Sequence, residues 1–394
     1  MKLFLIKLGK AWNVLKRDGL WRGGKRILEA FFSLFQTVEP GDVLFISNGV
    51  GDSARYRARH VAEELEFQGF RTAVTVQDNP FLVSYAEKFS VFIFHRVVYT
   101  KKVQRFVERL KELKKEIVFE TDDLVYDPKY LQMMDYYKHM NVFEKKLYTH
   151  GLGGEILADP RVEVATVTTS YLAHKLREKG KRVYIVRNKL SKEDVAWAEN
   201  ILHSLQKESP VIRMGYLSGT PSHNKDFATI TEALSSLLRA NTNLRLVVAG
   251  PLDLESELNA YASQIERIPF LPRQEYFAAA AKLDINLAPL EIGNPFCESK
   301  SELKFIEAGL LSVPTVAAAT QTYREAIRDG VDGFVASNNE EWKDKIERLI
   351  ADQELRRRIG EAARLSVLTR YTTEKANEKE YYDYLRSKIK IQVG

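Results

Sequence analysis

Residues 43–69 read VLFISNGVGDSARYRARHVAEELEFQG and form the unit that decides the fold. The run VLFIS is apolar throughout, as expected of a strand that is buried on both faces of a parallel sheet. The stretch that follows, residues 53–68, places apolar side chains at helical spacing and stops at Gly69, a typical helix end. A buried strand followed by an amphipathic helix predicts the first half of a βαβ unit.

The same alternation continues along the chain. Further strand-like runs lie at residues 72–76, 91–94, 117–120, 162–169, 183–188, 211–219, 244–250, 284–290, 314–318 and 333–336. A polar stretch near residues 190–210 separates two sets of these runs, so the sequence predicts an α/β protein with two Rossmann-like domains. The expected parts are an N-terminal basic amphipathic helical segment (1–36), a first domain (37–205), a second domain (206–372) and a C-terminal helix (373–394).

Composition limits the class of protein. The chain has 394 residues, of which 45% are hydrophobic and 28% charged, an ordinary balance for a globular protein. Charges interrupt every apolar stretch before it reaches the roughly 18 residues that a membrane-spanning helix needs. The single cysteine, Cys297, excludes a disulfide framework and a Cys-based zinc cluster. It fits a reducing compartment, so we expect a cytoplasmic protein.

The net charge of +6 is concentrated at the N-terminus. Residues 1–36 hold eight Lys and Arg against two acidic residues, which accounts for the whole excess, so a nucleic-acid-binding surface is not expected. Leu5, Leu8 and Trp12 recur at helical spacing in this basic segment. Two hypotheses are open: a helix pair on an anionic membrane surface, with Trp12, Trp21 and the phenylalanines inserted, or a helix packed on the protein's own core.

Polar side chains gather where the predicted strands of the first domain end. After the first strand, a loop with Gly49 and Gly51 exposes backbone N–H groups that suit an anion or a sugar hydroxyl. Asp122 and Asp123 follow the fourth strand, where they can contact sugar hydroxyls, hold a divalent metal or merely cap the next segment. His95 lies at the third strand, and a single histidine more often has an ordinary structural role.

The second domain contains a pattern suited to a nucleotide sugar. Gly219 ends an apolar strand and Lys225 precedes a helix, which fits a diphosphate. Lys300 and Lys304 are four residues apart and Glu307 follows by three, so all three can share one helical face. Lysines for phosphate oxygens and a glutamate for ribose hydroxyls match a sugar-nucleotide site, although an isolated Lys-x-x-Glu is more often a surface ion pair.

The order of these pieces resembles the GT-B glycosyltransferases, especially the retaining family 4 enzymes that assemble bacterial surface polysaccharides. The resemblance covers about residues 41–372 and includes the segments SARYR, ETDDLVYD, SGTPSHNKDF and KSELKFIEAGLLSVPTVA. It implies two domains that face a central cleft. It also implies a donor site in the second domain, with the diphosphate lined by Gly219, Thr220 and Lys225, a cationic clamp completed by Lys300 or Lys304, and the ribose held by Glu307.

One position departs from the family pattern. Many members have a glutamate eight residues before the ribose-binding glutamate, where it contacts the transferred sugar. Here that place is taken by Ser299, with Glu298 one position earlier. These two residues are the candidate sugar contacts, and the identity of the donor sugar stays open.

The resemblance implies an enzyme that moves a sugar from a nucleoside-diphosphate sugar to a glycan or lipid-linked glycan, with retention, in cell-surface polysaccharide synthesis. No metal or other cofactor is expected, because the lysines can stabilise the leaving diphosphate. No catalytic base is assigned. The acceptor is expected on the first domain, at Asp52, Arg55, Arg57, Arg96, Asp122 and Asp123. A nucleotide-sugar epimerase of the same fold and a noncatalytic carbohydrate-binding protein are the alternatives.

Overall fold

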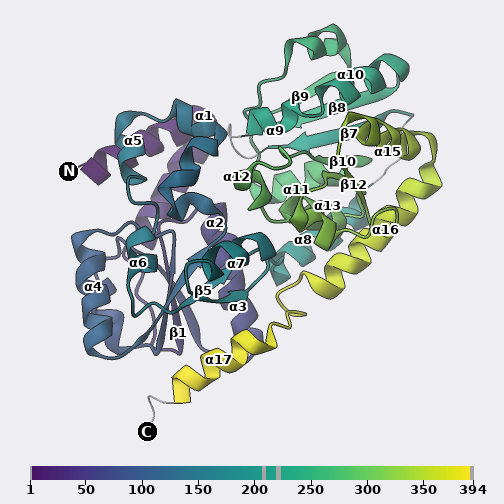
Figure 1. Cartoon of the computed structure of the whole chain (residues 1–394). Coiled ribbons are helices and arrows are strands. Elements are labelled where there is room, and N and C mark those ends of the chain that lie inside the picture. Colours follow the sequence, from purple (N-terminus) through teal and green to yellow (C-terminus); the bar gives the residue numbers. More distant parts are fainter. Residues whose placement is uncertain (1, 206–209, 219–222, 391–394) are drawn as a thin grey trace. The chain divides into compact units, whose positions relative to one another are not determined.

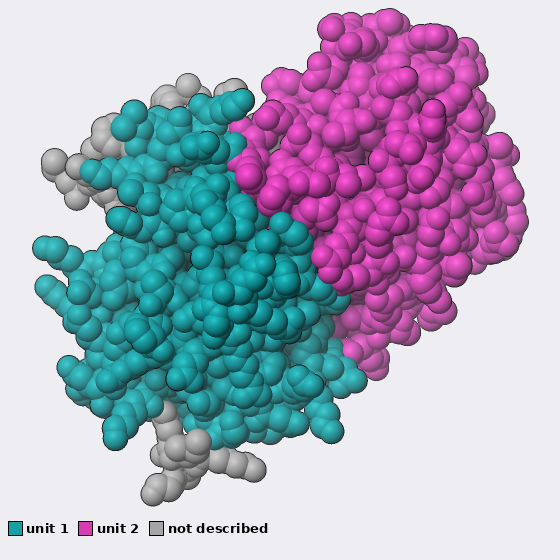
Figure 2. Space-filling model, viewed as in Figure 1, with its two compact units in different colours: residues 1–132, 137–189, 376–394 teal, residues 133–136, 190–375 magenta. Residues whose placement is uncertain are grey.

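The computed structural model describes residues 2–205, 210–218 and 223–390 (Figure 1). The chain forms two compact units, shown in different colours in Figure 2. Unit 1 comprises residues 1–132, 137–189 and 376–394, and unit 2 comprises residues 133–136 and 190–375. This division falls after Lys189, earlier than the predicted limit at residue 205, and it returns the C-terminal residues to unit 1.

Unit 1 is built on a sheet of six parallel strands in the order β2-β1-β3-β4-β5-β6. The strands are β1 Val43–Ser47, β2 Thr72–Val76, β3 Val91–His95, β4 Glu116–Thr121, β5 Val164–Val167 and β6 Arg182–Ile185. Every residue of β1 and β3 is buried, as the continuous apolar runs predict for strands covered on both faces. All six strands coincide with predicted runs.

Helical segments connect and flank these strands. They are α1 Lys2–Ser33, α2 Asp52–Ala54, the π-helical turn η1 Arg55–Arg59, α3 His60–Phe67, η2 Leu82–Glu87, α4 Lys101–Glu112, η3 Leu124–Tyr126, η4 Pro128–Met133, η5 Asp135–His139, α5 Val142–Leu147, α6 Gly154–Ala158, α7 Ser170–Arg177 and α17 Lys379–Lys390. In α17, Tyr381 and Leu385 pack into the same core cluster as Val43 and Val91 of the sheet. The C-terminal helix is therefore an integral part of unit 1.

Unit 2 repeats the architecture with a second parallel sheet in the order β12-β11-β10-β7-β8-β9. Its strands are β7 Ile212–Leu217, β8 Leu244–Ala249, β9 Ile265–Ile268, β10 Ile285–Ala288, β11 Thr315–Ala318 and β12 Phe334–Ala336. Strand β9 was not predicted. The two sheets confirm the predicted α/β fold with two Rossmann-like domains.

The helices of unit 2 are α8 Lys192–Ser204, α9 Asn224–Ala228, α10 Thr231–Ala240, η7 Ser256–Gln264, α11 Arg273–Ala281, α12 Pro295–Glu298, α13 Leu303–Leu310, α14 Gln321–Ala326, α15 Asn339–Ala351 and α16 Gln353–Arg370. Two glycines let α13 and the residues after it lie close to α16. A Cβ at Gly309 would stand 2.9 Å from a methyl carbon of Val367, and one at Gly360 would stand 2.1 Å from the Ser312 carbonyl oxygen. This packing fixes α13, which carries the candidate donor residues.

The N-terminal helix α1 bends at Gly19, where φ is 77°. Beyond this point several large apolar side chains are exposed to solvent: Leu20, Trp21, Leu28, Phe31, Phe32 and Phe35. Trp21 is 93% exposed and Phe32 68%, so these side chains do not pack into the protein's own core. Among the described residues, no helix is long and apolar enough to cross a membrane.

Candidate functional site

The candidate donor site of unit 2 is centred on Lys304 of α13. Its Nζ donates a hydrogen bond of 2.6 Å to the carbonyl of Leu217, the last residue of β7, and lies 4.6 Å from the centre of the Tyr216 ring. Burial lowers the pKa of Lys304, against the raising effect of Glu307 and Asp226. The ammonium thus stands at the carboxyl end of a central strand, where ligands bind in open α/β sheets.

Glu307 lies one helical turn after Lys304 and is already held by two donors. Arg273 Nη1 donates to its Oε1 at 3.1 Å, and the Tyr276 hydroxyl donates to its Oε2 at 2.8 Å. A carboxylate offers several acceptor positions, which suits Glu307 to the hydroxyl groups of a ribose. Tyr276 keeps its proton for this bond, because burial and the nearby Glu307 raise its pKa.

Arg273 also connects Glu307 to the start of α8. Its Nε and Nη2 donate to the two oxygens of Asp194 at 2.7 and 2.9 Å. Asp194 in turn forms a capping box with Ser191 at the N-terminus of α8. Sequence reasoning missed Arg273, Tyr276 and Asp194, because these residues are far from Glu307 in the chain and no local motif links them.

The other predicted donor residues do not lie on helix α13. Lys300 precedes α13, which begins at Leu303, so the prediction that it shares a helical face with Lys304 and Glu307 was wrong. Its Nζ lies 4.4 Å from the centre of the Phe296 ring. Lys225 is exposed on the short helix α9. Gly219 and Thr220 lie outside the described residues.

The two candidate sugar contacts face different environments. Ser299 is fully buried, and its hydroxyl donates to the Phe296 carbonyl at 2.7 Å. Glu298 accepts the backbone N–H of Gly293 at 3.0 Å and that of Gln321, at the start of α14, at 3.1 Å. Glu298 therefore fixes a loop after β10 to the first turn of α14, whereas Ser299 is turned inward.

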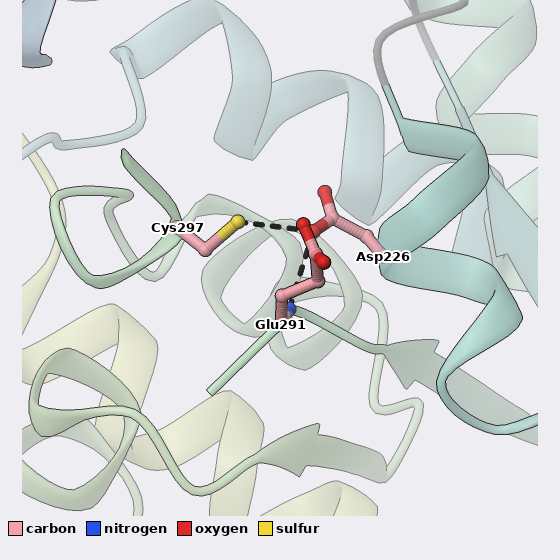
Figure 3. Close-up of side chains that lie close together, drawn as sticks. All are labelled: Asp226, Glu291 and Cys297. Atoms are coloured by element: carbon pink, nitrogen blue, oxygen red, sulfur yellow. Dashed lines mark hydrogen bonds between the residues drawn. The ribbon is translucent and has the colours of Figure 1, made fainter. Parts of the chain in front are cut away.

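Figure 3 shows a polar cluster formed by Asp226, Glu291 and Cys297. Asp226 Oδ1 accepts hydrogen bonds from the Cys297 thiol at 3.1 Å and the Glu291 N–H at 3.2 Å, and its Oδ2 lies 2.9 Å from His223 Nδ1. Burial and the Asp226 carboxylate raise the pKa of Cys297, so the thiol stays protonated. Protonated thiols are poor metal ligands, and both Asp226 oxygens already have partners. We therefore interpret the cluster as hydrogen-bonded support for the loop that contains His223.

In unit 1, four of the six predicted acceptor-side residues come together at the carboxyl ends of β3 and β4. Arg96 Nε donates to Asp122 Oδ1 at 2.6 Å, and Arg96 Nη2 is paired with Asp123. Asp123 also caps η3 by accepting the Val125 N–H at 3.0 Å, which is the capping role considered for it in the sequence. Arg96 has a φ of 50°, an uncommon left-handed conformation for a residue other than glycine. Such backbone strain is frequent at functional sites.

Arg57 enters this cluster from the π-helical turn after α2. It is fully buried, with Nε donating to Glu120 Oε1 at 2.7 Å and Nη1 to the Val186 carbonyl at 2.8 Å. Single π-helical turns recur at functional sites. Asp52 and Arg55 instead form their own pair at 3.8 Å, with the Asp52 side chain 67% exposed.

Three further side chains belong to this cluster: Ser53, His95 and Glu120. The sequence analysis did not select Ser53 or Glu120, and it gave His95 an ordinary structural role. Ser53 Oγ lies 2.7 Å from His95 Nε2 and 3.0 Å from Asp122 Oδ2. His95 Nδ1 is paired with Glu120 Oε2. His95 and Glu120 are direct register partners on adjacent strands, which puts their side chains on the same face of the sheet.

Comparison with known proteins identifies relatives of the fold. Residues 214–366 match the family model described as "Glycosyl transferases group 1". Among solved structures, the chain is similar to HepE (Alr3699) of Anabaena in complex with UDP and glucose, with a TM-score of 0.58, 14% identity, and coverage of 88% of this chain and 100% of that one. No curated protein matches the chain.

Two more structures show the same architecture. A glycosyltransferase of Rickettsia africae has a TM-score of 0.59 at 13% identity, covering 90% of this chain and 100% of that one. Sucrose-phosphate synthase of Thermosynechococcus elongatus has a TM-score of 0.57 at 13% identity, covering 89% and 98%. The fold is thus GT-B, the two-Rossmann-domain architecture. Together with the match of residues 214–366 to the group 1 glycosyl transferases, it confirms the predicted resemblance to GT-B glycosyltransferases.

Proposed function

We propose that the protein transfers a sugar from a nucleoside-diphosphate sugar to a glycan or lipid-linked glycan, with retention, in the synthesis of a cell-surface polysaccharide. The observation that carries this proposal is the pair Lys304 and Glu307 on α13, an ammonium at the end of β7 and a carboxylate one helical turn away. The ammonium suits phosphate oxygens, and the carboxylate suits the hydroxyl groups of a ribose.

We infer that the donor nucleotide is uridine diphosphate, since the structurally similar HepE was crystallised with UDP and glucose. Cleavage of the donor builds negative charge on the diphosphate. Lys304, with Lys300 from the loop before α13 and Lys225 from α9, stabilises that charge, so turnover is expected to need no divalent metal.

Thermal unfolding with UDP, GDP and ADP tests the donor assignment. A ligand at about 100 times its dissociation constant adds roughly 2.7 kcal/mol to stability, and we expect this for UDP. Lys304→Ala should lose at least about half of the effect, and Lys343→Ala, at an exposed lysine of α15, should keep it. Absence of stabilisation by all three nucleotides would contradict the proposal. Isomerisation of the donor sugar without an acceptor would indicate an epimerase instead.

We further propose that residues 1–36 attach the enzyme to the inner face of the cell membrane. Two features support this: the eight basic residues of the segment and the exposed apolar side chains of α1 around Trp21 and Phe32. Near an anionic leaflet each Lys or Arg contributes about 1 kcal/mol, and inserted aromatic rings add a contribution that salt does not screen. A lipid-linked acceptor would then lie at the same surface.

A further inference from the structure

His223, the residue before α9 in unit 2, is held by the buried carboxylate of Asp226. Burial alone would raise the pKa of Asp226, but hydrogen bonds from His223 and Cys297 outweigh burial and lower it, so Asp226 is charged. His223 Nδ1 lies 2.9 Å from Asp226 Oδ2, and because a charged carboxylate only accepts, Nδ1 carries the hydrogen of this bond. The other ring nitrogen, Nε2, has no hydrogen-bond partner among the residues that the structure describes. The side chain is 22% exposed, so Nε2 is the nitrogen that is left for a ligand.

The imidazole of His223 and the ammonium of Lys304 lie against the same tyrosine. The rings of His223 and Tyr216 meet edge to face with their centres 6.5 Å apart, and Lys304 Nζ lies 4.6 Å from the centre of the Tyr216 ring. The same Nζ donates to the carbonyl of Leu217 at 2.6 Å, at the carboxyl end of β7. His223 therefore belongs to the candidate donor site of unit 2, although the sequence analysis did not select it.

We propose that His223 is a phosphate-binding residue of this site: it takes up a proton when a nucleoside diphosphate binds, and Nε2 then donates to a phosphate oxygen. The inference rests on the proposed function and deepens it, because it adds a contact to the diphosphate and makes donor binding depend on pH. The proton comes from the solvent, and no covalent bond other than the new N–H bond is formed or broken.

The charges around His223 explain why the proton arrives with the nucleotide. Burial lowers the pKa of His223 from 6.5, and the positive charges of Lys300 and Lys304 lower it further, against the opposing effect of Asp226. The neutral imidazole therefore predominates at pH 7 in the free protein. A bound diphosphate offsets the charges of the two lysines and adds its own negative charge, so both it and Asp226 then favour the imidazolium. Because Nδ1 is bonded to Asp226, the new proton resides on Nε2, where it forms a charge-assisted hydrogen bond.

The other titratable groups near His223 leave this balance in place. Tyr216 and Cys297 keep their protons, because burial raises the pKa of both. The further ionisable side chains around α9 are Glu291, Asp135, Asp253 and Lys225. None of these four forms a hydrogen bond with the imidazole in the described part of the chain. Asp226 is thus the charged group that contacts the imidazole directly, and the two lysines are the charges that a diphosphate neutralises.

Calorimetric titration with UDP at pH 7, in two buffers of different ionisation enthalpy, measures the protons taken up on binding. Wild type should take up more protons than His223→Gln. The comparison between these two proteins cancels the proton exchange of the terminal phosphate of UDP itself. His203→Gln, at an exposed histidine of α8, is the matched control and should behave as wild type. Equal proton uptake by wild type and His223→Gln, with UDP bound by both, would overturn the proposal.

The pH dependence of UDP affinity separates a phosphate contact from a supporting role. His223→Gln should bind UDP roughly tenfold more weakly than wild type at pH 6, and the difference should vanish by about pH 8.5, where the complex has lost the added proton. His223→Asn keeps an N–H for Asp226 but lacks Nε2, so it should lose affinity in the same way. Wild-type affinity in His223→Asn would overturn the phosphate contact and leave His223 a support of its loop. If wild type binds no nucleoside diphosphate at all, the proposed function fails, and the inference falls with it.

Discussion

A strong pH dependence of stability is expected from Glu64, a fully buried residue of α3. Lys189 Nζ lies 3.0 Å from its Oε2, and the Tyr382 hydroxyl donates to its Oε1 at 2.6 Å. The same ammonium also binds Glu378 at 2.5 Å, so two carboxylates share one positive charge. Burial, with Glu378 adding to it against the opposing Lys189, raises the pKa of Glu64 from 4.5 to about 7.

The sign of the effect follows from proton binding in the two states. As pH rises from 4.5 to 7, the unfolded chain releases the Glu64 proton while the folded chain keeps it, so the free energy of unfolding falls. A shift of 2.5 units at 1.36 kcal/mol per unit corresponds to about 3 kcal/mol as an upper limit. Glu64→Gln removes this titration. Its stability relative to wild type should therefore rise by up to about 3 kcal/mol between pH 4.5 and pH 8.

Urea unfolding of both proteins at pH 4.5, 6 and 8 measures this change. The test is how the difference in unfolding free energy between the two proteins changes with pH. Its absolute value is less informative, because the new amide beside Lys189 has a cost that does not depend on pH. Glu66→Gln, on the exposed face of the same helix, is the matched control and should leave the pH dependence unchanged. Parallel pH profiles for wild type and Glu64→Gln would refute the reasoning. Lys189 and Glu378 lie close to the two points where the chain leaves and re-enters unit 1, so the cluster also anchors both connections.

Three further outcomes are expected. Glu307→Ala and Lys304→Ala should each weaken nucleoside-diphosphate binding by roughly 1.5 to 3 kcal/mol in calorimetric titrations, as is typical of lost charge-assisted hydrogen bonds, and unchanged affinity in both would remove α13 from the donor site. Turnover should survive EDTA, whereas a loss restored by magnesium or manganese would assign a metal to the donor phosphates. The full chain should sediment with anionic vesicles, partly detach at high salt, and lose binding when residues 1–36 are deleted; indifference to such vesicles would exclude the membrane proposal.

The fold was predictable because most strands of the two sheets are central and buried. Continuous apolar runs such as Val43–Ser47 reveal such strands directly. The missed strand, β9, reads IERI and lies at the edge of its sheet, where none of its residues is fully buried. An edge strand tolerates charged side chains, so its pattern resembles that of a loop. The other edge strands, β2, β6 and β12, were predicted, so it is the charged side chains of β9 that hid this strand.

The donor residues that could be predicted are those that lie near one another in the sequence. Lys304 and Glu307 are three residues apart on one helix, so helical spacing alone places them on the same side. Arg273 and Asp194 come from two other helices, and only tertiary packing brings them to Glu307. Lys300 was misplaced because helix α13 begins three residues after it, and a helix start is less certain from sequence than the helix itself.

The contacts among Ser53, His95 and Glu120 show what parallel topology adds to such spacing. Ser53, His95 and Glu120 follow or belong to β1, β3 and β4, and the strand order β1-β3-β4 makes these three strands neighbours. His95 is four residues from the start of β3, and Glu120 is four residues from the start of β4; the two starts are register partners, so the two side chains must meet on one face. His95 seemed ordinary in the sequence because its partner is 25 residues away. Because of the strand order and register, His95 lies between Glu120 and the partly exposed hydroxyl of Ser53 and contacts both.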